Sequence, residues 1–458
     1  MVFSGLSFLY YFLPCVLCIY FAAPSKGQNL VLLAASLIFY AWGEPKYVLL
    51  MLFFIVGGYG VGILLEKRRK GVLAFAITGF AGIFLIFKCS DSLPVGISFY
   101  TFQIISYLVD VYRGEVPAQK KLLPFALYVS MFPQLIAGPI VRYQDVMKQM
   151  ENRRTTWQGA EMGIRRFIIG LSKKVLLANE LGELCRIFRA SDEKSLLYYW
   201  LYAVAFCLHI YFDFSGYSDM AIGLGRLFGF SFPENFNYPY TAKSITEFWR
   251  RWHMSLGTWF RDYVYIPLGG SRTPGWKQYR NILLVWMLTG FWHGAAWNFV
   301  LWGLYFGLLL IFEKKWILPE RGGMWRGGDK VWREAHGRWR GRLGMWREVL
   351  GHVYVMLLVI VGFVIFQAED LSQAAEDIRG MFGMGGVPVY SAEAGYYLRS
   401  YGMTLLAAAV GSTPWPVRVV EGSAVWAFVK SAVLLALLFL STAHLAEGSF
   451  QPFLYFQF

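Results

Sequence analysis

Two of the six histidines lie in apolar, aromatic-rich sequence, where an ionisable side chain is unusual. His293 lies between Gly290 and Gly294, inside residues 281–311, which contain no Asp, Glu, Lys or Arg. An ionisable group at membrane depth is costly and therefore marks a candidate functional site. Imidazole has an ordinary pKa of about 6.5 and can act as a base near neutral pH, and the two glycines would let backbone or substrate approach closely. We therefore predict that His293 is catalytic, the alternative being a hydrogen-bonded core histidine.

His253 is the second candidate, and its neighbours are basic and aromatic. It lies in the stretch Thr246–Ser255, which is predicted to form a short helix with Trp249, Trp252 and His253 partly on one side. The basic residues around the two histidines are Lys243, Arg250, Arg251, Arg261, Arg272, Lys277 and Arg280. Guanidinium groups suit phosphates, so this set could hold a nucleotide such as coenzyme A. Anchoring of the chain on the cytoplasmic side explains the same residues equally well.

Other residues that could carry chemistry give weaker signals. His209 lies inside apolar residues 196–212, and a structural or solvated role is predicted for His336, His352 and His444. The pair Asp213 and Asp219 could form a carboxylate dyad, but hydrogen bonding or neutralisation of nearby Arg is the preferred interpretation. No local spacing of ligands supports zinc, and Cys15 and Cys18 are predicted to be small packing residues. We therefore predict no metal.

The motifs of several large enzyme classes are missing. The chain has no Gly-x-Ser-x-Gly elbow, no Walker loop and no Rossmann glycine fingerprint. Serine hydrolases, ATPases and dinucleotide enzymes are therefore excluded as leading interpretations.

The composition is that of a membrane protein. Apolar residues make up 57% of the 458 residues and charged residues only 16%, too few to cover a soluble protein of this size. Intrinsic disorder and a disulfide-stapled secreted fold are excluded by the same numbers. The net charge of +14 reflects basic residues between apolar runs, which favours cytoplasmic loops over a nucleic-acid partner.

Apolar runs predict an all-α multi-pass protein, because a bilayer-spanning helix needs about 20 such residues. The long candidates are 4–23, 46–64, 71–88, 196–212, 349–366 and 424–445. Shorter or interrupted candidates are 29–42, 95–111, 121–140, 161–180, 281–311 and 400–411. The first run lacks a basic leader and is predicted to be a retained span. The Pro-broken stretch 92–145 and the charged stretch 213–275 must be buried in protein or line a cavity.

Basic residues predict the orientation. Residues 66–70 and 314–347 are assigned to the cytoplasm, and the Trp–Arg pairs of the second stretch favour an amphipathic segment on the inner leaflet. Three spans precede residue 66, so the N-terminus is predicted outside. The acidic stretch 369–393 is also placed outside. If 400–411 and 424–445 both cross, the C-terminus lies outside as well.

Several motifs of this chain resemble those of the membrane-bound O-acyltransferase (MBOAT) family, and within it the alginate O-acetyltransferase group. The matching stretches are 93–103, 132–140, 212–223, 233–239, 246–253, 259–270 and 292–298. The likeness extends from about residue 1 to residue 312. It implies the MBOAT fold, with about 10–11 transmembrane helices plus re-entrant and interfacial helices around a central funnel. It also implies that His293 and His253 are catalytic, near the narrowest point of that funnel.

The C-terminal tail, residues 446–458 after a transmembrane domain of 1–445, carries a further resemblance. Its ending, 451–458, is similar to the companion peptide of teichoic-acid D-alanylation, which implies that Tyr455 carries an acyl group. An interfacial aromatic anchor is the alternative. The family also implies an acetyl-CoA donor, for which Arg250, Arg251, Trp252, Trp292 and Asn298 are candidate binding residues. No bound cofactor is expected.

The function predicted from these features is O-acetylation of a cell-surface polysaccharide across the bacterial cytoplasmic membrane. The donor is a cytoplasmic thioester, and an extracytoplasmic SGNH-type serine transferase is the implied partner, because no sizeable soluble domain could hold a polymer. The alternatives are a lipid O-acyltransferase or D-alanyl transferase of the same fold, and a non-enzymatic transporter. The transporter should show paired, broken half-repeats, and none is visible.

Overall fold

The computed structural model describes residues 2–90, 93–136, 138–273, 275–317, 342–421 and 424–448, and within these ranges every regular element is a helix. The chain divides into two compact units. Unit 1 comprises Met1–Leu176, Asp213–Asn235 and Val429–Gln457. Unit 2 comprises Leu177–Phe212, Phe236–Phe428 and Phe458. The prediction of an all-α membrane protein is confirmed.

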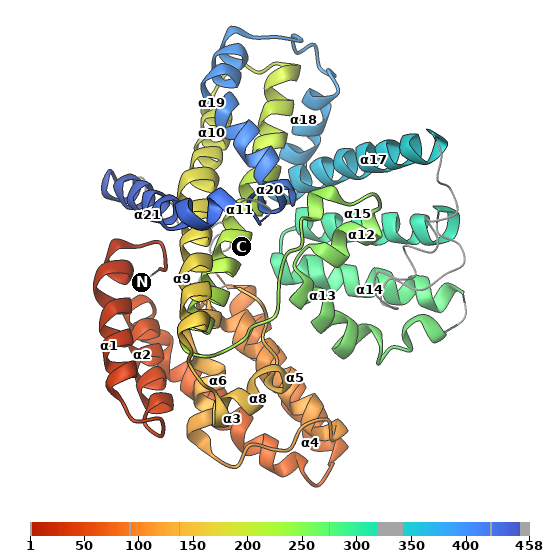
Figure 1. Ribbon diagram of the computed structural model, residues 1–458. Helices are drawn as coiled ribbons and strands as arrows, with labels where there is room; N and C mark the ends of the chain where they lie inside the picture. The colour runs from red at the N-terminus through yellow and green to blue at the C-terminus, as the bar shows by residue number, and fades with distance from the viewer. Residues whose placement is uncertain are drawn as a thin grey trace. The chain divides into compact units, whose positions relative to one another are not determined.

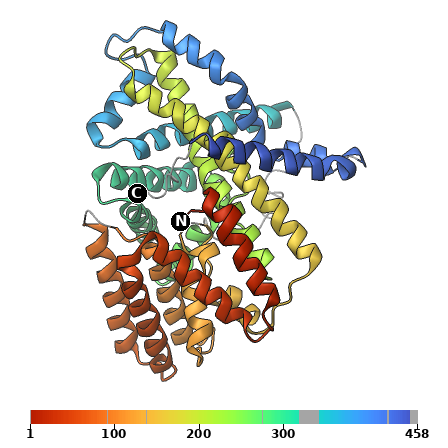
Figure 2. The same ribbon diagram turned by 90° about the vertical axis from the view of Figure 1, so that its left-hand side faces the viewer.

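Unit 1 is built largely from the N-terminal helices. Its elements are α1 (Leu13–Ala22), preceded by a π-helical turn at Phe8–Phe12, α2 (Gln28–Gly43), α3 (Val48–Leu65), α4 (Lys70–Lys88), α5 (Ile97–Arg113), α6 (Leu122–Ser130), α7 (Phe132–Leu135), α8 (Tyr143–Asn152) and α9 (Trp157–Ser172). Helices α1 and α2 pack together as a hairpin at the red end of the colour scale (Figures 1 and 2). Helix α5 packs against both α3 and α4.

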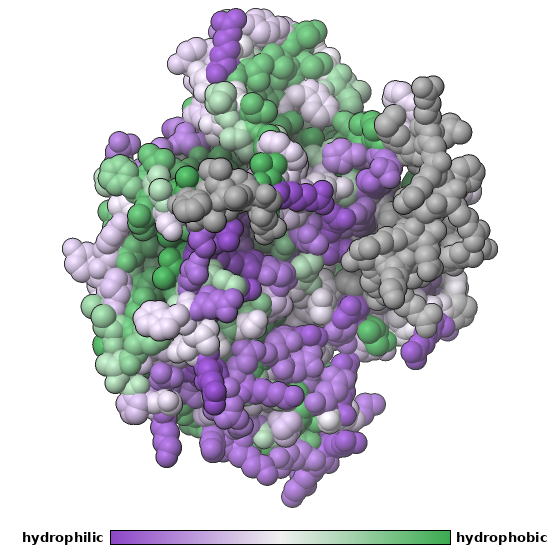
Figure 3. Space-filling model, in the orientation of Figure 1, coloured by the Kyte–Doolittle hydropathy of each residue, from purple (hydrophilic) through white to green (hydrophobic). Residues whose placement is uncertain are grey.

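The outward surface of α1 and α2 is apolar, as expected of a face that contacts lipid. Large apolar side chains such as Ile19, Phe21 and Ile38 are each more than half exposed there, and the surface over these helices is green in Figure 3. Cys15 and Cys18 also lie on an exposed face. The prediction that they are packing residues is therefore wrong, because they point away from the core.

Five helices in the described ranges are long and apolar enough to cross a bilayer: Pro45–Leu65, Lys70–Lys88, Leu196–Leu227, Glu348–Gln367 and Val429–Ala446. Two shorter apolar helices, Phe8–Ala22 and Gln28–Gly43, match two further predicted spans. The predicted span 121–140 is broken into α6 and α7, because Met131 adopts a non-helical backbone before Pro133. The predicted amphipathic segment on the inner leaflet falls mostly outside the described residues.

Unit 2 is built from helices that begin in the middle of the chain. They are α10 (Asn179–Ala190), the first half of α11 (Leu196–Leu227), α12 (Ile245–Arg251), α13 (Met254–Phe260), α14 (Trp276–His293), α15 (Trp297–Phe312), α17 (Arg342–Gln367), α18 (Leu371–Met381), α19 (Ala392–Gly411) and α20 (Trp415–Glu421). The predicted span 281–311 is a helical hairpin, α14 and α15, because the backbone of Gly294 is extended and ends the first helix. The weak span 400–411 is the second half of the longer α19.

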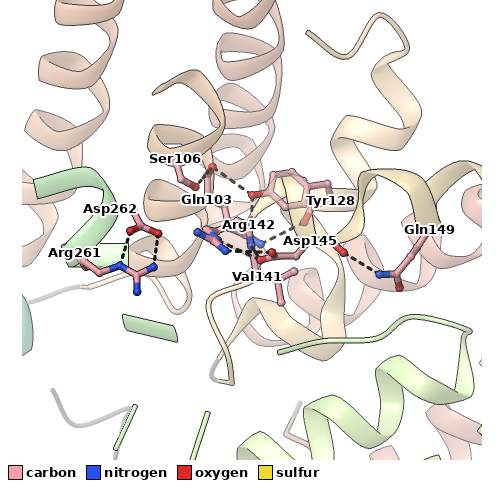
Figure 4. A network of polar contacts seen from close by, with 9 residues as sticks. All are labelled: Gln103, Ser106, Tyr128, Val141, Arg142, Asp145, Gln149, Arg261 and Asp262. Carbon is pink, nitrogen blue, oxygen red and sulfur yellow. Dashed lines mark hydrogen bonds and ion pairs between the residues drawn. The ribbon is translucent and has the colours of Figure 1, made fainter. Parts of the chain in front are cut away.

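A polar network in unit 1 connects α5, α6 and α8 (Figure 4). The Tyr128 hydroxyl donates to the backbone carbonyls of Gln103 (3.4 Å) and Val141 (3.3 Å). At the start of α8, the Asp145 carboxylate accepts from the backbone N–H of Arg142 at 3.0 Å. Buried polar groups are stabilised when they are hydrogen-bonded. The network therefore satisfies polar groups of the Pro-broken stretch, whose residues 97–108 and 124–136 are buried in protein as the sequence predicts.

Helix α11 continues 15 residues beyond the predicted span 196–212, through both Asp213 and Asp219. The helix tolerates these carboxylates because cations of unit 1 neutralise them. Lys174 Nζ lies 2.5 Å from Asp213 Oδ1, and Lys173 Nζ lies 2.6 Å from Asp219 Oδ2. Arg166 also contacts Asp219, at 2.9 Å. The predicted neutralisation by basic residues is thus observed, with lysines as the nearest partners, and the dyad alternative is wrong.

The Lys174–Asp213 pair should be a major contributor to stability. Both side chains are at most 3% exposed, and removing one partner of a buried pair typically costs about 3–5 kcal/mol. We expect Asp213→Ala to lower the melting temperature of the purified protein markedly. The control Glu183→Ala removes a carboxylate from an exposed pair with Arg186 and should cost less than about 1 kcal/mol. Equal melting temperatures of the two variants would contradict the prediction.

Candidate active site

Helices α14 and α15 pack together as a hairpin (Figure 1). His293 is the last residue of α14 and therefore lies at the turn between the two helices. The two helices lie so close that a Cβ on Gly290 would come 2.3 Å from the carbonyl oxygen of Phe299. A Cβ on Gly303 would likewise come 2.3 Å from the carbonyl oxygen of Trp286. Such contacts are shorter than any real Cβ makes, so both positions require glycine. The close approach predicted beside His293 is therefore one of backbone to backbone at Gly290, whereas a Cβ on Gly294 would meet the ring of Phe299.

Aromatic rings surround the half-buried His293. Its ring centroid lies 5.2 Å from Trp302 and 5.0 Å from Phe366, and both rings meet the imidazole edge to face. Trp292 is also close, at 4.6 Å. Edge-to-face contacts of this kind orient a ring as well as burying it. The imidazole is therefore held in a defined position by residues of α14, α15 and α17.

Asn298 supports this aromatic wall. Its amide nitrogen donates to the backbone carbonyls of Ala368 (2.6 Å) and Phe366 (3.5 Å), where α17 ends. The bonds tie the start of α15 to the residue whose ring contacts His293. Asn298 is predicted from the sequence to bind the donor. In the structure its amide instead holds the segment that carries Phe366.

His253 lies between α12 and α13, so the predicted short helix through this residue is wrong. The helix ends at Arg251, because Trp252 is extended and His253 adopts an unusual backbone conformation. Its φ is +44°, in the left-handed region. Strained backbone of this kind costs about 1–3 kcal/mol and clusters at functional sites. The side chain is 4% exposed, and burial lowers the pKa of His253 to about 3. The imidazole is therefore neutral near pH 7.

One pocket of unit 2 has both histidines on its wall, with about 550 Å³ of empty space including the open mouth. Its lining residues are Trp249, Arg250, Trp252, His253, Leu256, Gly257, Phe260, Val285, Trp286, Thr289, His293 and Trp302. Among the predicted donor-binding residues, Arg250 and Trp252 belong to this wall. The mainly apolar lining with a few polar groups is typical of a small-molecule site.

Two of the predicted donor-binding residues, Trp292 and Arg251, are not among the residues that line the pocket. Trp292 lies near both histidines, with its ring centroid 6.1 Å from that of His253. Arg251 donates to Glu247 at 2.5 Å and to Thr241 at 2.8 Å, so its guanidinium braces α12. Tyr455, the predicted acyl carrier, lies outside the described residues.

Trp286 and Trp302 were not singled out by the sequence. Both line the pocket, and Trp302 is 2% exposed. A signal was present, because Trp286, Thr289 and His293 follow the i, i+3, i+7 spacing of one helix face. That spacing predicts a shared face but not which faces form a pocket.

His209 is a buried core histidine. Its Nδ1 lies 2.7 Å from the carbonyl oxygen of Ala178, and it is not among the residues lining the pocket. His352 is 3.3 Å from the carbonyl oxygen of Ala242. Both arrangements agree with structural roles.

Comparison with known proteins gives this site its context. The MBOAT family, described as membrane-bound O-acyltransferases, matches residues 117–318. A probable alginate O-acetylase of Pseudomonas putida is 37% identical over the full length of both chains. One of Azotobacter vinelandii is 40% identical over 84% of this chain and 79% of its own. The chain belongs to the MBOAT family.

A third relative broadens the chemistry seen among MBOAT proteins. A peptidoglycan O-acetyltransferase of Helicobacter pylori is 31% identical over 84% of this chain and 81% of its own. Together with the apolar helices, these relatives identify the protein as a multi-pass membrane O-acyltransferase. The transporter alternative is thereby set aside.

Proposed function

We propose that this MBOAT protein acetylates a cell-surface polysaccharide, taking the acetyl group from acetyl-CoA on the cytoplasmic side of the bacterial cytoplasmic membrane. The observation that carries the proposal is that His253 and His293 line one pocket together with Arg250. Relatives named as alginate O-acetylase and peptidoglycan O-acetyltransferase support acetyl as the acyl group and an envelope polymer as the acceptor.

The geometry of the hairpin supports access from two sides. The 13 residues from Arg280 to His293 rise about 20 Å along α14. Arg280 and Lys314 mark the basic ends of the hairpin, which the positive-inside rule assigns to the cytoplasm. The tip lies at the end of α17, whose next residues include Glu369 and Asp370. A thioester would then reach far in from the cytoplasm, and an alcohol would approach from outside.

His293 is the general base in this proposal. An acceptor hydroxyl attacks the thioester carbonyl, and its proton passes to the His293 imidazole as the C–O bond forms. Collapse of the tetrahedral intermediate breaks the C–S bond, and the thiolate leaves with the proton from His293. The neutral His253 orients the hydroxyl or donates a hydrogen bond to the oxyanion. Arg250 holds a phosphate of the donor.

The acceptor hydroxyl in the first step belongs to Tyr455 at the C-terminus. The acyl-tyrosine then passes its acetyl group to the serine hydroxyl of a separate extracytoplasmic SGNH-type transferase, by ester exchange. That partner delivers the group to the polymer. Both termini lie outside in this arrangement.

Intact mass spectrometry after exposure to isotope-labelled acetyl-CoA tests the donor and the carrier together. A labelled acetyl adduct on the purified full chain supports the proposal. Labelling by a D-alanyl carrier protein instead, or acetylation of lipid alone, would overturn it.

Replacing Tyr455 with phenylalanine should abolish polymer acetylation, because the variant keeps the ring but has no nucleophilic oxygen. The measurement is acetyl release from polymer made by cells that express each variant at equal levels. Gln457→Ala, in the same tail, serves as the matched control and should acetylate normally. Polymer acetylation by Tyr455→Phe at the wild-type rate would rule out the carrier role.

A further inference from the structure

A fully buried carboxylate lies against the start of α12. Glu313 directly follows α15 and is 0% exposed. One carboxylate oxygen accepts from the backbone N–H of Ile245 at 2.5 Å. The other accepts from the backbone N–H of Thr246 at 2.8 Å and from its hydroxyl at 2.7 Å. A single side chain therefore accepts three hydrogen bonds from the first two residues of another helix.

The physical effect of these contacts is to fix the end of a very short helix. The first N–H groups of a helix have no partner inside it, and a negative charge at this end is favoured by the helix dipole. The Ser244 hydroxyl, as the N-cap side chain, accepts from the N–H of Glu247 at 3.0 Å. Glu313 satisfies the earlier donors from outside the helix. A seven-residue helix has little stability of its own, so it depends on tertiary contacts. Glu313 supplies the hydrogen-bonded contact at its first turn, while Phe248 and Trp249 pack against Phe363 and Trp286.

The position of α12 matters because its residues line the pocket. Trp249 and Arg250 lie on α12, and His253 follows the helix after one further residue, Trp252. Glu313 follows the helix that pairs with α14, which carries His293. The carboxylate thus connects the element holding one histidine to the hairpin holding the other.

We propose that Glu313 is a positioning residue that sets the His253 segment against His293. Its effect on catalysis rests on the proposed function, whereas its effect on the His253 segment rests on the hydrogen bonds alone. Nothing in the comparisons assigns a role to this residue. Glu313 takes no part in the covalent steps, since its hydrogen bonds come from the first two residues of α12 and not from either histidine.

The test compares Glu313→Ala and Glu313→Gln with the full-length wild type in detergent. Glutamine keeps one carbonyl oxygen and should retain part of the anchor. The matched control is Glu348→Ala, which removes an exposed carboxylate 3.1 Å from Lys243. Each protein is purified as a monodisperse peak, and all activities are expressed per folded molecule.

The first measurement is the rate at which diethyl pyrocarbonate modifies each histidine. Trypsin separates the two sites, because residues 252–261 and 281–314 each contain one histidine. In Glu313→Ala the rate at His253 should rise about tenfold, since unsatisfied buried N–H groups favour local opening. The rate at His293 should change by less than about twofold. Glu348→Ala should match the wild type at both sites.

The second measurement is acyl transfer. Misplacing a reacting group by about 1 Å can cost about 100-fold in rate, so kcat should fall about 10- to 100-fold in Glu313→Ala with KM for the donor nearly unchanged. Glu313→Gln should lie between this variant and the wild type. A purely structural role would lower the yield of folded protein and leave kcat per molecule unchanged.

The proposal is overturned if His253 labelling stays at the wild-type rate in both folded variants, or if kcat per folded molecule is unchanged. If Glu313→Ala does not fold, Glu313→Gln alone decides by the same two criteria. Failure of the proposed function is a separate outcome. In that case the wild type itself transfers no acetyl group, while the labelling rates still report on Glu313.

Discussion

Acyl transfer should fall by about 10²–10⁴-fold when His293 is replaced with alanine, which is the usual contribution of a general base. The wall that orients the imidazole, Trp302 and Phe366, is built by other residues and stays in place. The variant should therefore fold and insert, and lose only the group that accepts the proton. The measurement is the initial rate of acetyl transfer from labelled acetyl-CoA, together with the melting temperature.

His293→Gln gives a sharper version of this test, because it keeps a polar side chain of similar size but cannot accept the proton at this step. We expect the same loss of rate. His444→Ala, a change on helix α21 (Ala424–Ala446), is the matched control and should retain wild-type transfer. Retained acetylation in either His293 variant would refute the assignment of the base.

The hairpin of α14 and α15, which carries His293, should be destabilised when Gly303 is replaced with valine. A Cβ at this position would lie 2.3 Å from the Trp286 carbonyl oxygen and 3.3 Å from the Cα of Gly290. Backbone atoms cannot move aside as a flexible side chain can, so the two helices must separate. Overpacking typically costs about 1–3 kcal/mol and occasionally more. We expect a melting temperature lowered by about 5–10 °C, with loss of transfer because His293 moves with the hairpin tip.

A matched comparison introduces alanine at two glycines. Gly303→Ala changes the close contact of the hairpin, and Gly82→Ala on α4 is its control. Nothing lies within 4 Å of the Cβ that would be added at Gly82, so this change should leave the melting temperature equal or slightly raised. Thermal unfolding followed by size-exclusion chromatography measures both variants. Equal stability of Gly303→Ala and Gly82→Ala would contradict the close packing of α14 and α15.

The long apolar helices were predictable from the sequence alone. The predicted runs 46–64 and 71–88 correspond to the helices Val48–Leu65 and Lys70–Lys88, within two residues at each end. The reason is local, because a segment in lipid must satisfy its own backbone hydrogen bonds and a helix does so without partners. The same reasoning identified His293 as unusual, since the cost of burying an imidazole is visible in the residues around it.

The sequence was a poorer guide where a helix depends on another element. Helix α11 runs on through Asp213 because Lys174 comes from a different part of unit 1. The run 281–311 turns back on itself at the extended Gly294, and the two helices can touch because Gly290 and Gly303 lack side chains. The hydropathy of one segment does not show that a lysine from another segment will neutralise its carboxylate, or that another helix backbone will pack against it.

The amino-acid sequence by itself determined the membrane class, the family motifs and the two histidines that could carry the chemistry. Only the tertiary structure decided that His253 and His293 line a common pocket, that Asn298 supports the Phe366 wall, and that Glu313 anchors α12. The physical reason is that a sequence displays the cost of burying a polar group at its own position. The group that compensates for that cost lies far along the chain and is brought close only by packing.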